Sequence, residues 1–177
     1  DPPKYRAVHL RLRRILEDYT PKITPKSIDE FVLDLAHTPL LARVGILTIA
    51  QEIKSRIKEE VGEWIRVSVG IAPNRFLAKT AAGMQKPDGL VVIDHQNIEE
   101  KYQSLLLGDL CGIKTNNIVR LNNVGIFTVL DFYRANLETL KSAFQSVVGY
   151  YWYMRLRGYE VDDVVFARRS YGNSFSP

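Results

Sequence analysis

Two adjacent carboxylates, Asp29 and Glu30, stand directly before the apolar residues 31–33. A buried ionised acid costs free energy unless it is paired or bound to a metal. Carboxylate oxygens suit Mg²⁺ and Mn²⁺. Because neighbouring strand residues point to opposite faces, both acids can serve one site only where a strand begins or bends. The pair therefore indicates either a divalent-metal site or an ordinary solvated strand end.

The segment VSVGIAPNRFLAKTAAGMQKPDG, residues 67–89, contains two notable cations, Lys79 and Lys86. It lacks the G-x-x-x-x-G-K-S/T arrangement of the Walker phosphate-binding loop, which excludes that type of site. Lys86 opens a Lys-Pro-Asp-Gly turn beside an expected strand, where its ammonium is well placed to hold a triphosphate as a point charge. A surface turn with no ligand explains the same residues.

Glycine followed by isoleucine occurs twice in a helical stretch, at Gly112-Ile113 and Gly125-Ile126. A Gly-hydrophobic hairpin between helices exposes backbone N–H groups and a helix N-terminus, which bind phosphate without contacting bases. These are the properties of a helix-hairpin-helix. The usual hairpin has a second glycine where this chain has Lys114, whose side chain can itself contact phosphate. A plain helix–turn–helix packing unit is the alternative.

The elements that must position these residues form two groups. In the first, apolar periodicity predicts helices over residues 4–19, 40–61 and 75–82, and strands over 26–37, 65–71 and 90–94. This alternation predicts a sheet covered by helices. From residue 98 onward the pattern is helical only. We therefore expect an α+β part followed by an all-helical part, with a boundary near residues 95–108.

Local signals set the expected helix ends. Thr38-Pro39 is typical of a helix start, and Asn74 and Asn136 are candidate caps. Thr128 and Asp131 have the spacing of a capping box. Gly83 is expected to end the helix that Asn74 begins.

Composition excludes several classes of protein. The chain has 177 residues, with 24 lysines and arginines against 20 acids, a net charge of +4. Residues 101–177 hold 9 basic and 6 acidic side chains, a surplus of three. This surplus permits nucleic-acid binding without requiring it. No apolar run is long enough to span a membrane, and no signal peptide opens the chain, so a cytoplasmic protein is the expectation.

Cysteine, histidine and aromatic residues give no further site. The single cysteine, Cys111, excludes an internal disulfide and is expected to be a small core residue. The three histidines are isolated in sequence and give no reason to propose zinc. Four consecutive aromatics, residues 150–153, are expected to pack in a core rather than stack on bases.

Together these motifs resemble the Y-family DNA polymerases, the translesion group that includes the DinB type. SIDEFVLDL is similar to the family's S-I-D-E-x-x-L-D palm segment, and residues 67–89 resemble its S-x-G-I-x-x-N-K-x-x-A-K-x-A-x-x-x-x-K-P-x-G segment, with Arg75 for the usual lysine. LCGIKTNNIVRLNNVGIFTVLDF resembles the thumb, and FARRSYGNSFSP resembles the connection to the little finger. The four matches follow the family's order over nearly the whole chain.

The resemblance implies a fold and a set of roles. Residues 1–107 would be a ferredoxin-like palm lacking its first strand and fingers, 108–165 a helical thumb with a helix-hairpin-helix, and 166–177 a linker to the little finger. Asp29 and Glu30 would bind the two Mg²⁺ ions of nucleotidyl transfer, with Mn²⁺ as an alternative, and Lys86 would contact the incoming deoxynucleoside triphosphate. Gly112, Ile113 and Lys114 would meet the backbone of primer-template DNA.

Departures from the family pattern set the expected limits. The family's third carboxylate, an aspartate on the first palm strand, has no match here, so we expect this chain alone to be inactive. A sliding clamp is a candidate partner through the region that follows, and a bacterial protein would associate with the nucleoid. A non-catalytic polymerase-like accessory and an unrelated helix-hairpin-helix DNA-binding module are the alternative functions.

Overall fold

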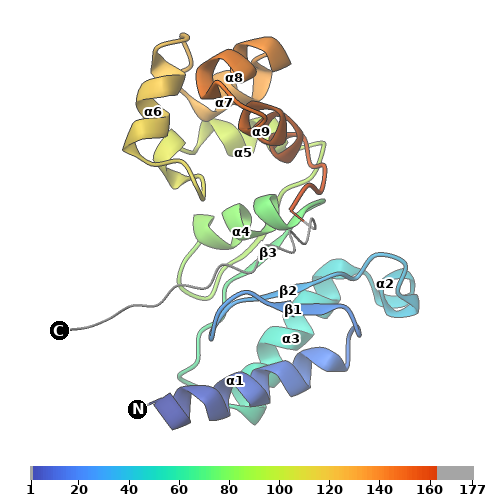
Figure 1. The fold of residues 1–177 in the computed structure, drawn as a ribbon. Helices are drawn as coiled ribbons and strands as arrows, with labels where there is room; N and C mark the ends of the chain where they lie inside the picture. The colour runs from blue at the N-terminus through green and yellow to red at the C-terminus, as the bar shows by residue number, and fades with distance from the viewer. Residues whose placement is uncertain (1, 163–177) are drawn as a thin grey trace, which may run out of the picture.

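The computed structural model describes residues 2–162 (Figure 1). The first elements are α1 (Pro2–Glu17), β1 (Ile23–Pro25), β2 (Phe31–Leu33), α2 (Pro39–Val44) and α3 (Ile46–Glu60). Next come β3 (Val69–Ile71), α4 (Arg75–Met84), β4 (Leu90–Val92) and α5 (Ile98–Gln103). A 3₁₀ turn, η1 (Leu107–Asp109), precedes α6 (Thr115–Asn122), α7 (Val129–Arg134), α8 (Leu137–Phe144) and α9 (Val148–Leu156). No helix of this range is both long and apolar enough to cross a membrane.

The described residues form two halves, each with its own core. In the first half, α1 and α3 pack together beneath the hairpin of β1 and β2 (Figure 1). Its buried apolar residues recur at helical spacing along both helices, as the sequence predicts: Leu12, Ile15, Leu16, Ile49, Ile53 and Ile57. This core holds the hairpin that carries Asp29 and Glu30.

The second half joins α4 to the C-terminal helices through one continuous core. Phe76 and Leu77 of α4 are buried in the same cluster as Trp152 of α9, and the rings of Phe76 and Trp152 meet edge to face. Of residues 150–153, Trp152 is fully in this core while Tyr150 is 37% exposed. The cluster runs from Phe76 to Leu156. Residues of the stretch 95–108, where the sequence predicts a boundary, are therefore part of this core.

The mixed α/β composition agrees with the expected class, but the strands are shorter than the sequence patterns indicate. Within the described residues, β1 and β2 pair antiparallel, and β3 and β4 pair parallel as a separate sheet. The expected single sheet is therefore not seen in this part of the chain. A close approach of α4 fixes β3: a Cβ on Gly70 would lie 1.9 Å from the Ala78 carbonyl oxygen, so only glycine fits.

Two expected helix boundaries are wrong. The helix predicted over 40–61 is divided at Gly45, whose φ of 81° is not helical. Gly83 lies inside α4 instead of ending it, because its φ is not positive and the helix continues to Met84. The predicted caps Thr38, Asn74, Thr128 and Asn136 are all confirmed, and each accepts a hydrogen bond from a first-turn N–H.

Candidate functional site

A cleft of about 2410 Å³ separates the two halves. β2 of the first half and β3 of the second both line it, and so do Asp29, Glu30, Lys86 and Gly112. These four candidate residues lie up to 83 positions apart in the sequence. The fold therefore brings the two carboxylates, the turn lysine and the hairpin glycine to one opening.

The carboxylates stand at the end of the β1–β2 loop, where β2 begins. The loop is closed by the Lys26 N–H, which donates to the Glu30 carbonyl over 2.8 Å. The Ser27 hydroxyl donates to Asp29 Oδ1 over 2.6 Å. Lys79 of α4 reaches across and donates to Glu30 Oε1 and Oε2 at 2.9 and 2.7 Å. Both acids are exposed, so neither carries the cost of a buried charge.

Electrostatics at the acid pair are dominated by Lys79. The hydrogen bond to Glu30 raises the pKa of Lys79, and attraction to Asp29 adds a smaller contribution in the same direction. The ammonium thus stands where a cation is favoured. The pair lies about 45–50% exposed, so solvent screens it strongly.

The donor set at this point fits part of a divalent-metal site. Two carboxylates at the start of one strand supply oxygen ligands of the kind Mg²⁺ takes. Among residues 2–162, no cluster of three or more His, Cys, Asp or Glu side chains has metal-binding geometry. Asp29 and Glu30 would therefore supply two ligands to such an ion and leave its remaining positions to other groups.

The hairpin residues separate into those that face solvent and one that does not. Ile113 is 0% exposed, and its N–H donates to the Leu110 carbonyl over 3.0 Å, so it packs in the core and has no free donor. Gly112 is exposed with a φ of 92°, and its carbonyl accepts from the Asn117 side chain. Lys114 is exposed at the N-cap of α6. Only Gly112 and Lys114 present groups to a ligand.

Cys111, beside this hairpin, is exposed, so the expectation of a core cysteine is wrong. The positive φ of Gly112 turns the chain outward at this point while Leu110 and Ile113 take the buried positions. Burial thus falls on the large apolar side chains on either side.

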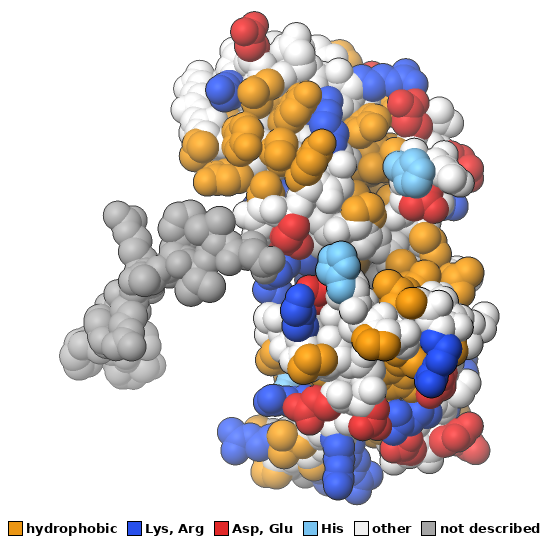
Figure 2. Space-filling view, turned by 90° about the vertical axis from the view of Figure 1, so that its right-hand side faces the viewer, with side chains coloured by type: hydrophobic (Ala, Val, Ile, Leu, Met, Phe, Trp, Pro, Cys, Tyr) orange, Lys and Arg blue, Asp and Glu red, His pale blue; other side chains and the backbone are white. Residues whose placement is uncertain are grey.

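Charge on the face shown in Figure 2 is mixed. Lysines and arginines lie among acids over the first half, and apolar side chains gather over the helices of the second half. Exposed apolar residues of these helices and their turns include Val119, Phe127, Val147, Val148 and Tyr150. On this face the lysines and arginines of residues 101–162 do not form a continuous patch.

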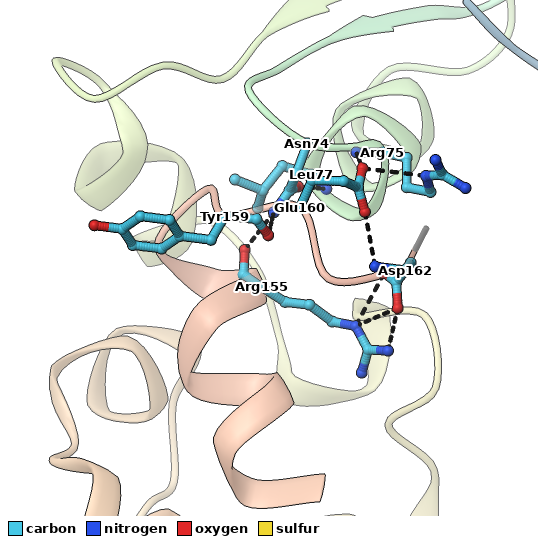
Figure 3. Close-up of polar contacts among 7 residues, drawn as sticks. All are labelled: Asn74, Arg75, Leu77, Arg155, Tyr159, Glu160 and Asp162. Carbon is cyan, nitrogen blue, oxygen red and sulfur yellow. Dashed lines mark hydrogen bonds and ion pairs between the residues drawn. The ribbon is translucent and has the colours of Figure 1, made fainter. Parts of the chain in front are cut away.

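A set of polar contacts, which we call the latch, joins Asn74 and Arg75 at the N-terminus of α4 to residues 155–162, at the end of α9 and just after it (Figure 3). Asn74 is 4% exposed; its Oδ1 accepts from Leu77 N, and its Nδ2 donates to the Arg155 and Tyr159 carbonyls, each over 2.9 Å. The N–H and Nε of Arg75 both donate to Glu160 Oε2 over 3.1 Å. The latch fixes α9 relative to the strand–helix unit that carries Lys79.

Arg155 closes the other side of the latch. Its guanidinium binds the Asp162 carboxylate in a bidentate manner, with Nε 3.0 Å from both oxygens, and lies over the Trp152 ring. The sequence predicts Asn74 as a cap but not as a latch, because its partners lie more than 80 residues away. No local pattern marks Arg155 or Glu160 as part of a site.

The comparisons with known proteins agree with this arrangement. Residues 1–83 match the impB/mucB/samB family. The DNA polymerase IV of Pelotomaculum thermopropionicum is 39% identical over 154 residues, which are 87% of this chain and 37% of that protein. The DNA polymerase IV of Pseudomonas aeruginosa is 40% identical over 143 residues, 80% of this chain and 40% of that protein.

Solved structures show the same fold. An insertion ternary complex of Dbh DNA polymerase superposes with a TM-score of 0.73 and 31% identity, over 91% of this chain and 46% of that one. DinB from Sulfolobus solfataricus gives 0.71 and 30%, over 89% and 46%. The chain spans less than half the length of these relatives. In sequence and in fold, the chain is thus similar to the DinB-type DNA polymerases of the Y-family.

Proposed function

We propose that this chain forms the palm and thumb of a polymerase that performs template-directed, error-prone translesion DNA synthesis. One observation carries the proposal: Asp29, Glu30, Lys86 and Gly112 line a single cleft. A nucleotidyl transferase needs metal-binding acids, a cation for the triphosphate and a grip on the duplex within reach of one another. The relatives named DNA polymerase IV support the same activity.

The proposed division assigns residues 1–107 to the palm and 108–165 to the thumb. The linker proposed for residues 166–177 lies outside the described residues. The latch at Asn74 supports a thumb that is held in a set position on the palm.

The proposed metal ligands are Asp29 and Glu30. Two divalent ions, Mg²⁺ or Mn²⁺, would activate the primer hydroxyl and stabilise the leaving pyrophosphate. The family's aspartate-bearing strand would supply the missing ligand. The cleft supports a position for this strand between β2 and β3. β2 and β3 line the cleft, and within the described residues each pairs with one other strand only. Each thus keeps one edge able to accept another strand.

Three residues of the chain, Lys86, Lys79 and Ser27, would each have a role when the substrates bind. The Lys86 ammonium would hold the triphosphate as a point charge. A metal ion bound to Glu30 would displace the Lys79 ammonium, because the ion and the ammonium compete for the same two carboxylate oxygens. Ser27 would continue to orient Asp29 through its hydroxyl.

The proposed thumb would hold primer-template DNA through a helix-hairpin-helix. Gly112 and Lys114 support this, because both are exposed at the N-terminus of α6, where N–H groups favour phosphate. Ile113 would shape the hairpin from inside the core. Contacts of this kind are independent of sequence.

Primer extension by the intact polymerase, which includes the regions that this chain lacks relative to its relatives, tests the proposal. Asp29→Ala and Glu30→Ala should each lower extension at least a hundredfold while leaving affinity for primer-template within about twofold. Glu59→Gln, an exposed acid on α3, is the matched control and should extend normally. Normal extension by Asp29→Ala would remove the carboxylate pair from the catalytic site and favour a non-catalytic accessory.

A further inference from the structure

Lys54 lies on α3, in the first half of the molecule, and contacts the Lys-Pro-Asp-Gly turn in the second half. Its ammonium donates to the backbone carbonyls of Asp88 and Gly89 and lies 3.0 Å from Asp88 Oδ1. Asp88 Oδ1 is buried and receives no hydrogen bond in the part of the chain that the structure describes, so its contact with this ammonium is an ion pair. All three contacts of this lysine thus fall on Asp88 and Gly89, the last two residues of the turn that Lys86 opens.

A second lysine completes the contact. Lys58, one helical turn further along α3, donates to Asp88 Oδ2 over 2.9 Å. Lys54 and Asp88 are 14% and 22% exposed, whereas Lys58 is 42% exposed. The Lys54 pair is less solvated, so solvent screens it less, whereas Lys58 adds a hydrogen bond to the Asp88 carboxylate.

The turn is also held from its other side. The Ser68 hydroxyl, just before β3, donates to the Gln85 carbonyl and accepts from Gly89 N, each over 3.2 Å. The backbone on both sides of Lys86 is therefore fixed. Lys86 itself stays exposed on the cleft, with no hydrogen bond or ion pair recorded within residues 2–162.

We propose that Lys54, through Asp88, is a positioning residue that aims Lys86 at the triphosphate of the incoming nucleotide. This inference rests on the proposed function, in which Lys86 contacts that triphosphate. Because the contacts of Lys54 hold the turn against α3, they fix the position of Lys86 at the cleft. That position is fixed relative to the half of the molecule that carries Asp29 and Glu30. A point charge gains little from hydrogen-bond geometry of its own, so its backbone must supply the placement.

Single-turnover nucleotide incorporation by the intact polymerase tests this role. Lys86→Ala should raise the nucleotide concentration for half-maximal rate about twentyfold, because it loses a charge-assisted contact. Lys54→Met should raise the same concentration about fivefold, and Lys54→Arg should restore most of it. Primer-template affinity should stay within about twofold in all three. The decisive measurement is the double variant, in which Lys54→Met should add less than about twofold to Lys86→Ala.

Arg56→Met is the matched control. Arg56 lies on the same helix but binds Asp18 and Glu60, away from the turn. Its removal should lower stability without changing the nucleotide dependence. If Lys54→Met proves unstable, Asp88→Asn makes the same test from the other partner.

The outcomes separate the two proposals. An effect of Lys86→Ala with none from Lys54→Met or Asp88→Asn overturns the positioning role and leaves the proposed function intact. Full additivity in the double variant also overturns it, because Lys54 would then act independently of Lys86. No effect from Lys86→Ala overturns the proposed role of Lys86 itself.

Discussion

Lys79 donates to both carboxylate oxygens of Glu30, from α4 in one half of the molecule to the start of β2 in the other. The two residues are 49 positions apart in sequence. With the Lys54–Asp88 pair, this contact spans the boundary between the two cores. Glu30, which is proposed to bind metal, is thus paired with the ammonium of a lysine from the same chain.

Replacing Lys79 should therefore ease metal binding while costing little stability. Because the pair is about half exposed, Lys79→Met should change the free energy of unfolding by less than about 1 kcal/mol. In the intact polymerase it should lower the Mg²⁺ concentration for half-maximal extension, since no ammonium then competes for Glu30. Urea denaturation and a Mg²⁺ titration check the two parts. An unchanged or increased Mg²⁺ requirement would contradict the competition.

Asn74→Asp should separate helix capping from the latch. An aspartate still accepts from Leu77 N, but it cannot donate to the Arg155 and Tyr159 carbonyls and faces them with a negative charge. We expect a loss of about 2 kcal/mol or more in the free energy of unfolding by urea. Asn136→Asp is the control, because Asn136 caps α8 and, within residues 2–162, the hydrogen bond of its side chain is the one that it accepts from Thr139 N. Equal stability of the two variants would show that the latch contributes nothing.

DNA binding should depend on salt through Lys114. In the intact polymerase, Lys114→Ala should weaken binding to duplexes of unrelated sequence by the same factor. It should also reduce the slope of log affinity against log salt by about one. Fluorescence anisotropy at several salt concentrations measures both. Lys141→Ala, an exposed lysine on α8, is the control and should leave the slope unchanged. Loss of affinity confined to one DNA sequence would refute a backbone contact.

Acid should weaken the ion pairs that Lys54 and Lys58 form with Asp88. The ammonium groups of Lys58 and Lys54 lower the pKa of Asp88 to about 2, against about 4 for an unfolded aspartate. A lowered pKa adds stability above the unfolded value, and this stability is lost as the pH falls from about 4 to about 2. The stability difference between this chain and Asp88→Asn should therefore be constant above about pH 5 and shrink below about pH 4. Urea denaturation across this range measures it, and a difference that grows on acidification would contradict the sign.

Sequence alone determined what depends on neighbours along the chain. The caps at Thr38, Asn74 and Thr128 follow from hydrogen bonds that span three residues, so short patterns predict them. Buried stripes on α1 and α3 follow from helical periodicity. The motifs around Asp29 and Lys86 carried enough information for the family resemblance, which the comparisons confirmed.

Tertiary structure decided which residues meet. The outward turn at Cys111 and the buried position of Ile113 depend on how whole elements pack. The contacts of Lys54 with Asp88, of Lys79 with Glu30 and of Asn74 with Arg155 join residues 34, 49 and 81 positions apart. No local spacing encodes such pairs, because their geometry arises only when two separately packed cores come together around one cleft.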